Sequence, residues 1–268
     1  DVGLHMHLVE TAYQKEYARR RTGTTALRHL HGLGLLGPRM TLGHGVWLTE
    51  DDIALAASTG ALICHNASSN LRLRSGVAPL NQLRAQGVRV GLGLDEAGLN
   101  DDRDMFQEMR LVLRLHRVPG MDDAVPTAPE VFEMATSGGA ATTGFGDRIG
   151  RLEPGRAADL VLLPWAAIAA PHLDPGVAPL EAIVHRGRAA AVDTVMVAGE
   201  VVLSDGRFTR VDRDAALAEL SAALRAPLRP EEERRRRLSA AIFPHVRRFY
   251  DGWLDAPRDP FYAPSARR

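Results

Sequence analysis

The chain has 268 residues, with 33 basic and 33 acidic side chains, no formal net charge and 45% hydrophobic residues. Balanced charge gives no electrostatic footprint for a nucleic acid, and the hydrophobic fraction suffices for a substantial core. The single cysteine, Cys64, excludes an internal disulfide. No apolar run approaches the roughly 20 residues needed to cross a bilayer. We therefore expect a cytoplasmic protein without nucleic-acid or membrane partners.

The first half of the chain alternates short apolar runs with helical patterns. The apolar runs predict strands at 2–9, 40–46, 61–64 and 88–94, and the helical patterns fall at 12–30, 50–57, 80–85 and 105–115. Such alternation predicts βα units and a parallel sheet, which curls into a barrel when the units repeat. A closed barrel of this type needs eight strands, so these four predict half of a (β/α)8 TIM-type barrel over residues 1–148.

A different pattern begins near Ile149. A turn-rich stretch leads into a strand ending near Leu163, and the runs 192–197 and 201–203 read as a hairpin. We predict a small β domain without crossover helices over residues 149–210. Residues 211–268 form a tail with helices at 212–225 and 231–254, and an apolar stripe on the second makes a homo-oligomer possible.

Three of the predicted strands end in side chains suited to metal chemistry. His7 ends the first run, His44 the second and Asp95 the fourth. The carboxyl ends of parallel barrel strands form one face, so these side chains can converge. Neutral imidazole and carboxylate are good ligands for zinc, with iron as a competitor. His7 and Asp95 are therefore predicted to bind one divalent metal, most simply zinc.

Two further roles follow from position. Glu10 lies just past a strand end, where a carboxylate can take a proton from an activated water and pass it to a leaving nitrogen. His44 could hydrogen-bond the attacking water or the developing anion. The alternatives for single residues are structural: His44 as an interior histidine with its hydrogen bonds satisfied, and Asp95 as a turn or helix-cap residue.

Four stretches carry a resemblance to a known family. They are His-Leu-Val-Glu-Thr at 7–11, Leu-Gly-His-Gly-Val-Trp-Leu-Thr at 42–49, Cys-His-Asn-Ala-Ser-Ser-Asn-Leu-Arg-Leu-Arg-Ser-Gly-Val-Ala-Pro-Leu at 64–80 and Gly-Leu-Gly-Leu-Asp at 91–95. In this order they resemble the amidohydrolase superfamily, and within it the cytosine-deaminase-like aminohydrolase and chlorohydrolase group. The stretch 149–160 is similar to the family's return from the barrel to a small β-sandwich.

The resemblance implies that the four strands are strands five to eight. The family's His-x-His motif on strand one is then absent from this numbering. His5-Met6-His7 is not that motif, because only three further strands separate it from Asp95. We expect the missing N-terminal half as a preceding segment, a companion chain or a domain-swapped neighbour.

The resemblance also assigns roles. His7 and Asp95 would be metal ligands, with Asp95 also a base toward water, Glu10 would be the proton shuttle, and His44 would contact substrate and water. Asn66 and Asn70 would shape the loop after the seventh strand, either touching substrate or capping turns. Glu96 stands where many relatives have a small residue; it could recognise an amidine or ring N–H, or be a solvated loop charge.

These roles predict a metal-dependent hydrolase that deaminates an amino-substituted nitrogen heterocycle of purine, pyrimidine, pterin or triazine type and releases ammonia. One alternative is a chlorohydrolase or cyclic amidohydrolase with the same site. Another is a catalytically incomplete fragment that acts only within a larger assembly.

Overall fold

A four-stranded parallel sheet forms the first part of the protein, in a computed structural model that describes residues 2–96, 98–99, 102–118, 120–121 and 124–255. Its strands lie in the order β1-β2-β3-β4, namely β1 (Leu4–Leu8), β2 (Met40–His44), β3 (Leu62–His65) and β4 (Val90–Leu92). The predicted parallel α/β arrangement is confirmed. Among the described residues β1 and β4 are the sheet edges, and only the last residue of β1 is buried whereas β2 is buried throughout.

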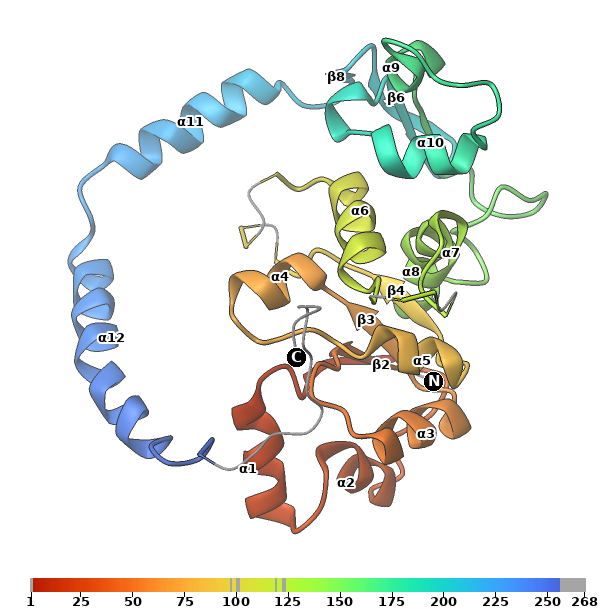
Figure 1. Cartoon of the computed structure of the whole chain (residues 1–268). Helices are drawn as coiled ribbons and strands as arrows, with labels where there is room; N and C mark the ends of the chain where they lie inside the picture. Colours follow the sequence, from red (N-terminus) through yellow and green to blue (C-terminus); the bar gives the residue numbers. More distant parts are fainter. Residues whose placement is uncertain (1, 97, 100–101, 119, 122–123, 256–268) are drawn as a thin grey trace.

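Helices follow each strand (Figure 1). They are α1 (Ala12–Thr22), α2 (Ala26–Gly32), α3 (Glu50–Thr59), α4 (Ala67–Arg72), α5 (Leu80–Ala85) and α6 (Met105–Leu115). The single helix predicted over 12–30 is wrong, because Gly23 ends α1 in the left-handed conformation at φ 74° and Thr25 caps α2. The short helix α4 was not predicted.

The core lies between the sheet and these helices. Its fully buried members include Leu27, Leu42, Ile63, Leu80 and Val112. The described chain then continues through α7 (Ala128–Glu133), the π-helix η1 (Met134–Gly138) and α8 (Gly139–Thr142), and the last two pack on β4. None of the described helices is both long and apolar enough to span a membrane.

A second sheet is antiparallel in the order β5-β6-β7-β8, with β5 (Leu160–Leu162), β6 (Thr194–Val197), β7 (Glu200–Ser204) and β8 (Arg207–Phe208). Helices that were not predicted interrupt this part of the chain. Between β5 and β6 lie α9 (Trp165–Ala169), α10 (Pro179–Arg186) and the 3-10 turn η2 (Ala189–Ala191). The apolar residues Ala182 and Val184 of α10 are buried, and α10 packs against α6 and α7. This insertion therefore packs with the helices that follow the parallel sheet.

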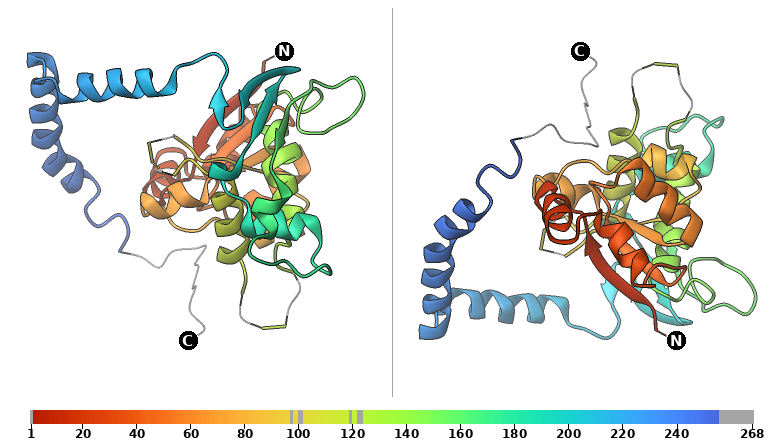
Figure 2. Two further views of the ribbon diagram at one scale, coloured as in Figure 1. Left: turned by 90° about the horizontal axis from the view of Figure 1, so that it is seen from above. Right: turned by 90° about the horizontal axis from the view of Figure 1, so that it is seen from below.

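Two helices, α11 (Arg213–Arg225) and α12 (Pro230–Phe249), form an arm that leaves the body of the protein (Figures 1 and 2). None of the residues described in these two helices is buried. The helix predicted over 231–254 ends early, and Trp253 lies beyond it, with its ring stacked on that of Tyr17 at a centroid distance of 6.3 Å. The end of the arm therefore returns to α1. The predicted boundaries at 148 and 210 stay predictions.

Candidate metal centre

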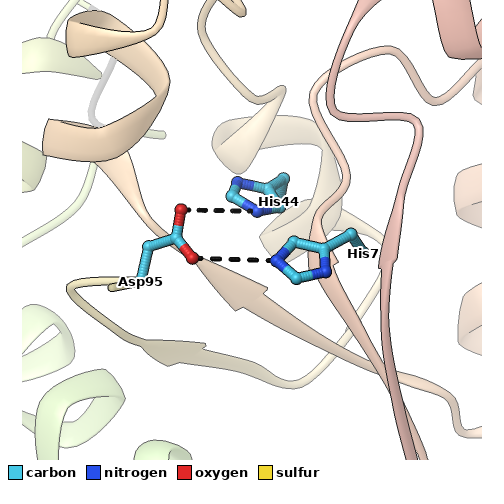
Figure 3. A group of neighbouring side chains, drawn as sticks. All are labelled: His7, His44 and Asp95. Carbon is cyan, nitrogen blue, oxygen red and sulfur yellow. Dashed lines mark ion pairs between the residues drawn. The ribbon is translucent and has the colours of Figure 1, made fainter. Parts of the chain in front are cut away.

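Three predicted site residues meet at the carboxyl edge of the parallel sheet (Figure 3). His7 Nε2 lies 3.7 Å from Asp95 Oδ1, and His44 Nε2 lies 3.9 Å from Asp95 Oδ2. The two imidazole rings stack with centroids 5.2 Å apart. One donor atom from each of the three residues lies within 4.8 Å of the other two. The strand ends thus bring together side chains from separate parts of the chain.

The backbone at this edge is held in an uncommon conformation. His44 has φ 73° and Asp95 has φ 63°, and Val9 beside the end of β1 has φ 42°. The left-handed region costs free energy for residues other than glycine, and such strain concentrates at functional sites. His44 is the last residue of β2 and Asp95 follows β4, and their side chains face each other across the site (Figure 3).

The donor set fits a divalent metal. His44 is fully buried, and its Nε2 atom has no hydrogen-bond partner among the described residues. Its Nδ1 atom lies 2.8 Å from Asn70 Oδ1, so Nδ1 carries the proton and Nε2 presents a lone pair. Distances of 3.7 and 3.9 Å from imidazole to carboxylate are too long for hydrogen bonds. A cation about 2 Å from His7 Nε2 and from Asp95 Oδ1 fits the 3.7 Å spacing of these two donors. His44 Nε2 then faces the same space with a lone pair available to a bound molecule.

Glu10 lies beside this group. Its Oε2 atom is 3.8 Å from His44 Nε2, and its Oε1 atom accepts a hydrogen bond from Ser75 Oγ at 3.0 Å. The Glu10 side chain is 15% exposed, so it lies between the buried imidazole of His44 and solvent. This position suits a group that exchanges protons with a bound molecule.

The predicted substrate-binding residues differ in their surroundings. Asn70 is 1% exposed and bonded to His44, and Asn66 is 5% exposed with its Oδ1 atom 3.6 Å from Cys64 Sγ. Both are buried in the segment after β3, with Asn66 just before α4 and Asn70 within it. Glu96 is exposed beside Asp95. Direct contact of these three residues with a substrate stays a prediction.

Sequence reasoning missed two supporting hydroxyls. Ser69 Oγ donates to Asp95 Oδ2 at 2.6 Å, and Ser75 supports Glu10 as described above. Both serines lie in the stretch 64–80 that carries the family resemblance, which was the available signal. Isolated serines have no periodicity or spacing that would distinguish them from ordinary loop residues.

Ionisable groups are also buried behind the site. His65 Nε2 lies 3.0 Å from His116 Nε2, and burial lowers the pKa of both imidazoles, that of His116 to about 4. Burial raises the pKa of the Glu108 carboxyl, and it raises the pKa of the Cys64 thiol to about 11. A thiol with that pKa is protonated at neutral pH, in agreement with a buried packing role for Cys64 rather than a nucleophilic one.

The fold and this site define an α/β protein with a candidate metal centre at the carboxyl edge of a parallel sheet. A profile described as "Amidohydrolase family" matches residues 1–202. A 5-methylthioadenosine/S-adenosylhomocysteine deaminase from Nitratidesulfovibrio vulgaris (strain Miyazaki F) is 42% identical over 82% of this chain and 49% of its own length. A 5'-deoxyadenosine deaminase from Methanothermobacter thermautotrophicus is 37% identical over 82% of this chain and 52% of its own length.

Solved structures agree with these relatives. An adenosine deaminase from Xanthomonas campestris with bound zinc is similar at a TM-score of 0.76 and 32% identity, over 82% of this chain and 49% of that one. Atrazine chlorohydrolase from Arthrobacter aurescens, complexed with zinc, is similar at a TM-score of 0.76 and 28% identity, over 83% and 48%.

The chain therefore belongs to the amidohydrolase family, and its neighbours include both deaminases and a chlorohydrolase, as the four stretches predicted. Its mixed α/β fold fits a TIM-barrel superfamily. The chain spans about half the length of the curated relatives that it matches.

Proposed function

We propose that this chain carries the metal centre and the proton-transfer groups of a hydrolase that deaminates an amino-substituted nitrogen heterocycle. The observation that carries the proposal is the meeting of His7, His44, Asp95 and Glu10, with the buried Nε2 atom of His44 unpartnered among the described residues. Imidazole and carboxylate donors suit zinc, and two neighbours were solved with zinc. Iron would suit the same donors.

His7 and Asp95 would hold the metal. When bound, it supplies Lewis acidity and brings the acidity of a water molecule close to neutral pH. The lone pair of His44 Nε2 would accept a hydrogen bond from the attacking water and orient it. Because Asn70 fixes the proton on Nδ1, this imidazole acts as an acceptor toward the water.

Glu10 would move one proton of the attacking water to the ring nitrogen. Asp95 would take the second proton and pass it to the departing amine. A carbon–oxygen bond forms, the exocyclic carbon–nitrogen bond breaks, and ammonia leaves. The product keeps a ring N–H and a carbonyl, so the atoms of water are fully accounted for.

We propose an adenosine-type nucleoside as the substrate, with the amine on the purine ring. Support comes from the names of the relatives, which act on 5-methylthioadenosine, S-adenosylhomocysteine or 5'-deoxyadenosine at identities of 37% and above. The atrazine chlorohydrolase neighbour, at 28% identity, supports a triazine less strongly.

A further polypeptide segment is part of the proposal. The relatives are about twice as long as the matched region, and the edge strand β1 is largely exposed. Parallel sheets are ordinarily covered on both faces, and free edges invite pairing. Additional βα units that pair with β1 would cover this edge and supply any remaining ligands.

The first experiment combines elemental analysis of the purified protein and its intact mass with two turnover assays. Ammonia release is measured on 5'-methylthioadenosine, S-adenosylhomocysteine, adenosine and guanine, and chloride release is measured on atrazine. About one zinc or iron per chain with ammonia from the adenosine compounds supports the proposal. Turnover of atrazine alone would move the substrate to the triazines. Metal-free protein without turnover after zinc addition would overturn the catalytic proposal.

A further inference from the structure

One short segment after β3 touches all three groups that would handle protons in the proposed reaction. This α4 segment, residues 66–75, comprises α4 with its flanking residues. Ser69 Oγ donates to Asp95 Oδ2 at 2.6 Å, and Asn70 Oδ1 lies 2.8 Å from His44 Nδ1. Ser75 Oγ donates to Glu10 Oε1 at 3.0 Å. The partners come from three other places along the chain, so one local element supports residues that are far apart in sequence.

The supporting side chains are shielded from water. Ser69 is fully buried, Asn70 is 1% exposed and Ser75 is 3% exposed. Water cannot readily replace a hydrogen bond at such positions, and a lost partner leaves a buried polar group unsatisfied. Each bond therefore fixes the orientation of the side chain that it reaches.

The α4 segment is itself braced. The indole Nε1–H of Trp47 donates to the Ser75 carbonyl at 2.8 Å, and the Ser75 amide donates to the Asn70 carbonyl at 2.8 Å. At the other end the Ser68 amide donates at 3.1 Å to Glu108 Oε1, on a side chain that is fully buried. The side chain of Asn66, which precedes the helix, makes no capping hydrogen bond. The carboxylate of Glu108 in α6 instead accepts the hydrogen bond from an amide of the first turn of α4.

We propose that Ser69, Asn70 and Ser75 are positioning residues. They fix the orientations of the metal ligand Asp95, the water acceptor His44 and the proton shuttle Glu10, respectively. The roles of these three groups rest on the proposed function. Ser69 holds one oxygen of Asp95 and leaves the other facing His7. Asn70 sets the tautomer of His44. Ser75 holds the Glu10 carboxyl beside His44 Nε2.

The three bonds have different consequences. Ser69 acts on a proposed ligand, so its hydroxyl supports metal affinity, as groups that hydrogen-bond a ligand ordinarily do. Asn70 and Ser75 act on groups that handle protons, so their loss lowers kcat with little effect on KM. A purely structural role would instead lower stability without separating these readouts.

The test uses the full protein with the variants Ser69→Ala, Ser69→Thr, Asn70→Ala and Ser75→Ala. Ser68→Ala is the matched control. The hydroxyl of this neighbouring serine in α4 makes no hydrogen bond with Asp95, His44 or Glu10. Zinc affinity is measured by competition with a chromophoric chelator, kcat and KM by ammonia release, and folding by thermal unfolding.

We expect Ser69→Ala to weaken zinc binding about 10- to 100-fold, with recovery in Ser69→Thr. Asn70→Ala and Ser75→Ala should lower kcat at least about 10-fold with KM nearly unchanged. Variants that fold like Ser68→Ala and match it in zinc affinity and kcat would overturn the inference. If the unaltered protein releases no ammonia from any compound, the proposed function fails, and the zinc affinities of the two Ser69 variants still decide the positioning role of that hydroxyl.

Discussion

The Nε2 atom of His7 lies 3.7 Å from the Oδ1 atom of Asp95, although His7 lies in the edge strand β1 and Asp95 follows the opposite edge strand β4. Three spacings of about 4.8 Å would separate the edge strands of a flat four-stranded sheet by about 14 Å. The two side chains and the residues between Leu92 and Asp95 cover part of this distance, and a sheet bent toward the site would cover the rest. Such a bend fits the TIM-barrel superfamily, in which parallel strands curl around one face.

Removal of either residue should therefore remove the metal. We expect His7→Ala and Asp95→Ala to purify without zinc, whereas His29→Ala, at an exposed histidine of α2, should keep it. Zinc added at 100 times its Kd should stabilise the unaltered protein by about 2.7 kcal/mol and leave the two site variants unchanged. Elemental analysis and thermal unfolding with and without zinc check this. Full zinc content in His7→Ala would exclude that residue as a ligand.

Glu10 should be needed for turnover but not for metal binding. Glu10→Gln keeps the size of the side chain and its acceptor oxygen for Ser75, but it cannot take up a proton near neutral pH. We expect kcat to fall by about 100- to 10,000-fold with zinc content unchanged. Ammonia release and elemental analysis on the same preparation test both parts. A loss of zinc equal to that of His7→Ala would instead make Glu10 a ligand.

Much of the site could be predicted because its chemistry is local in sequence. Each polar residue follows a short apolar run, and parallel strands bring their carboxyl ends to one edge, so His7, His44 and Asp95 could be grouped without a structure. The supporting contacts could not, because Ser69 lies in a helix of six residues and Ser75 just after it, and neither has a periodic pattern. Their partners lie 26 and 65 residues away.

The fold was predictable to a similar extent. Hydrophobic runs located four strands of the parallel sheet, but the break between α1 and α2 depends on one left-handed glycine, Gly23. The insertion between β5 and β6 was missed although α10 has the signals of a helix, with Pro179 at its start, Glu181 in its first turn and Arg186 in its last. Its packing against α6 and α7 could not be read from the sequence. Cytoplasmic location and homo-oligomerisation remain predictions.

The buried pair of His65 and His116 should make the protein sensitive to mild acid. Burial and then Arg84 lower the pKa of His116 from 6.5 to about 4, so the unfolded chain binds the proton more readily than the folded one. The free energy of unfolding is therefore highest above pH 6.5, where the imidazole is neutral in both states, and it decreases as the pH falls toward 4. The loss from His116 is on the order of 3 kcal/mol.

Urea unfolding of the metal-free protein between pH 7 and pH 4 measures this loss. His116→Gln removes the titrating imidazole, so its free energy of unfolding should fall less over the same range. His29→Gln removes an exposed imidazole and should follow the unaltered protein. Identical pH dependence in all three proteins would rule out His116 as a source of acid sensitivity.

Gly93 should tolerate no side chain, because it lies where the strand end, the α4 segment and Asp95 come together. A Cβ atom added at Gly93 would lie 2.4 Å from Asn66 Oδ1 and 2.9 Å from Cys64 Sγ, both on buried side chains. Overpacking of this kind costs about 1–3 kcal/mol. Relief of the clash would also shift the backbone that carries Asp95, so zinc affinity should fall along with stability.

Gly32→Ala is the matched control, because a Cβ at that helical glycine meets no atom within 4 Å. It should be neutral or stabilise the protein by up to about 1 kcal/mol, since alanine favours a helix over glycine. Urea unfolding and chelator competition on both variants separate the two effects. Gly93→Ala could instead lose stability and still bind zinc as tightly as Gly32→Ala. The packing around Asn66 would then be independent of the metal centre. The α4 segment would in that case support Asp95 through the hydroxyl of Ser69 alone.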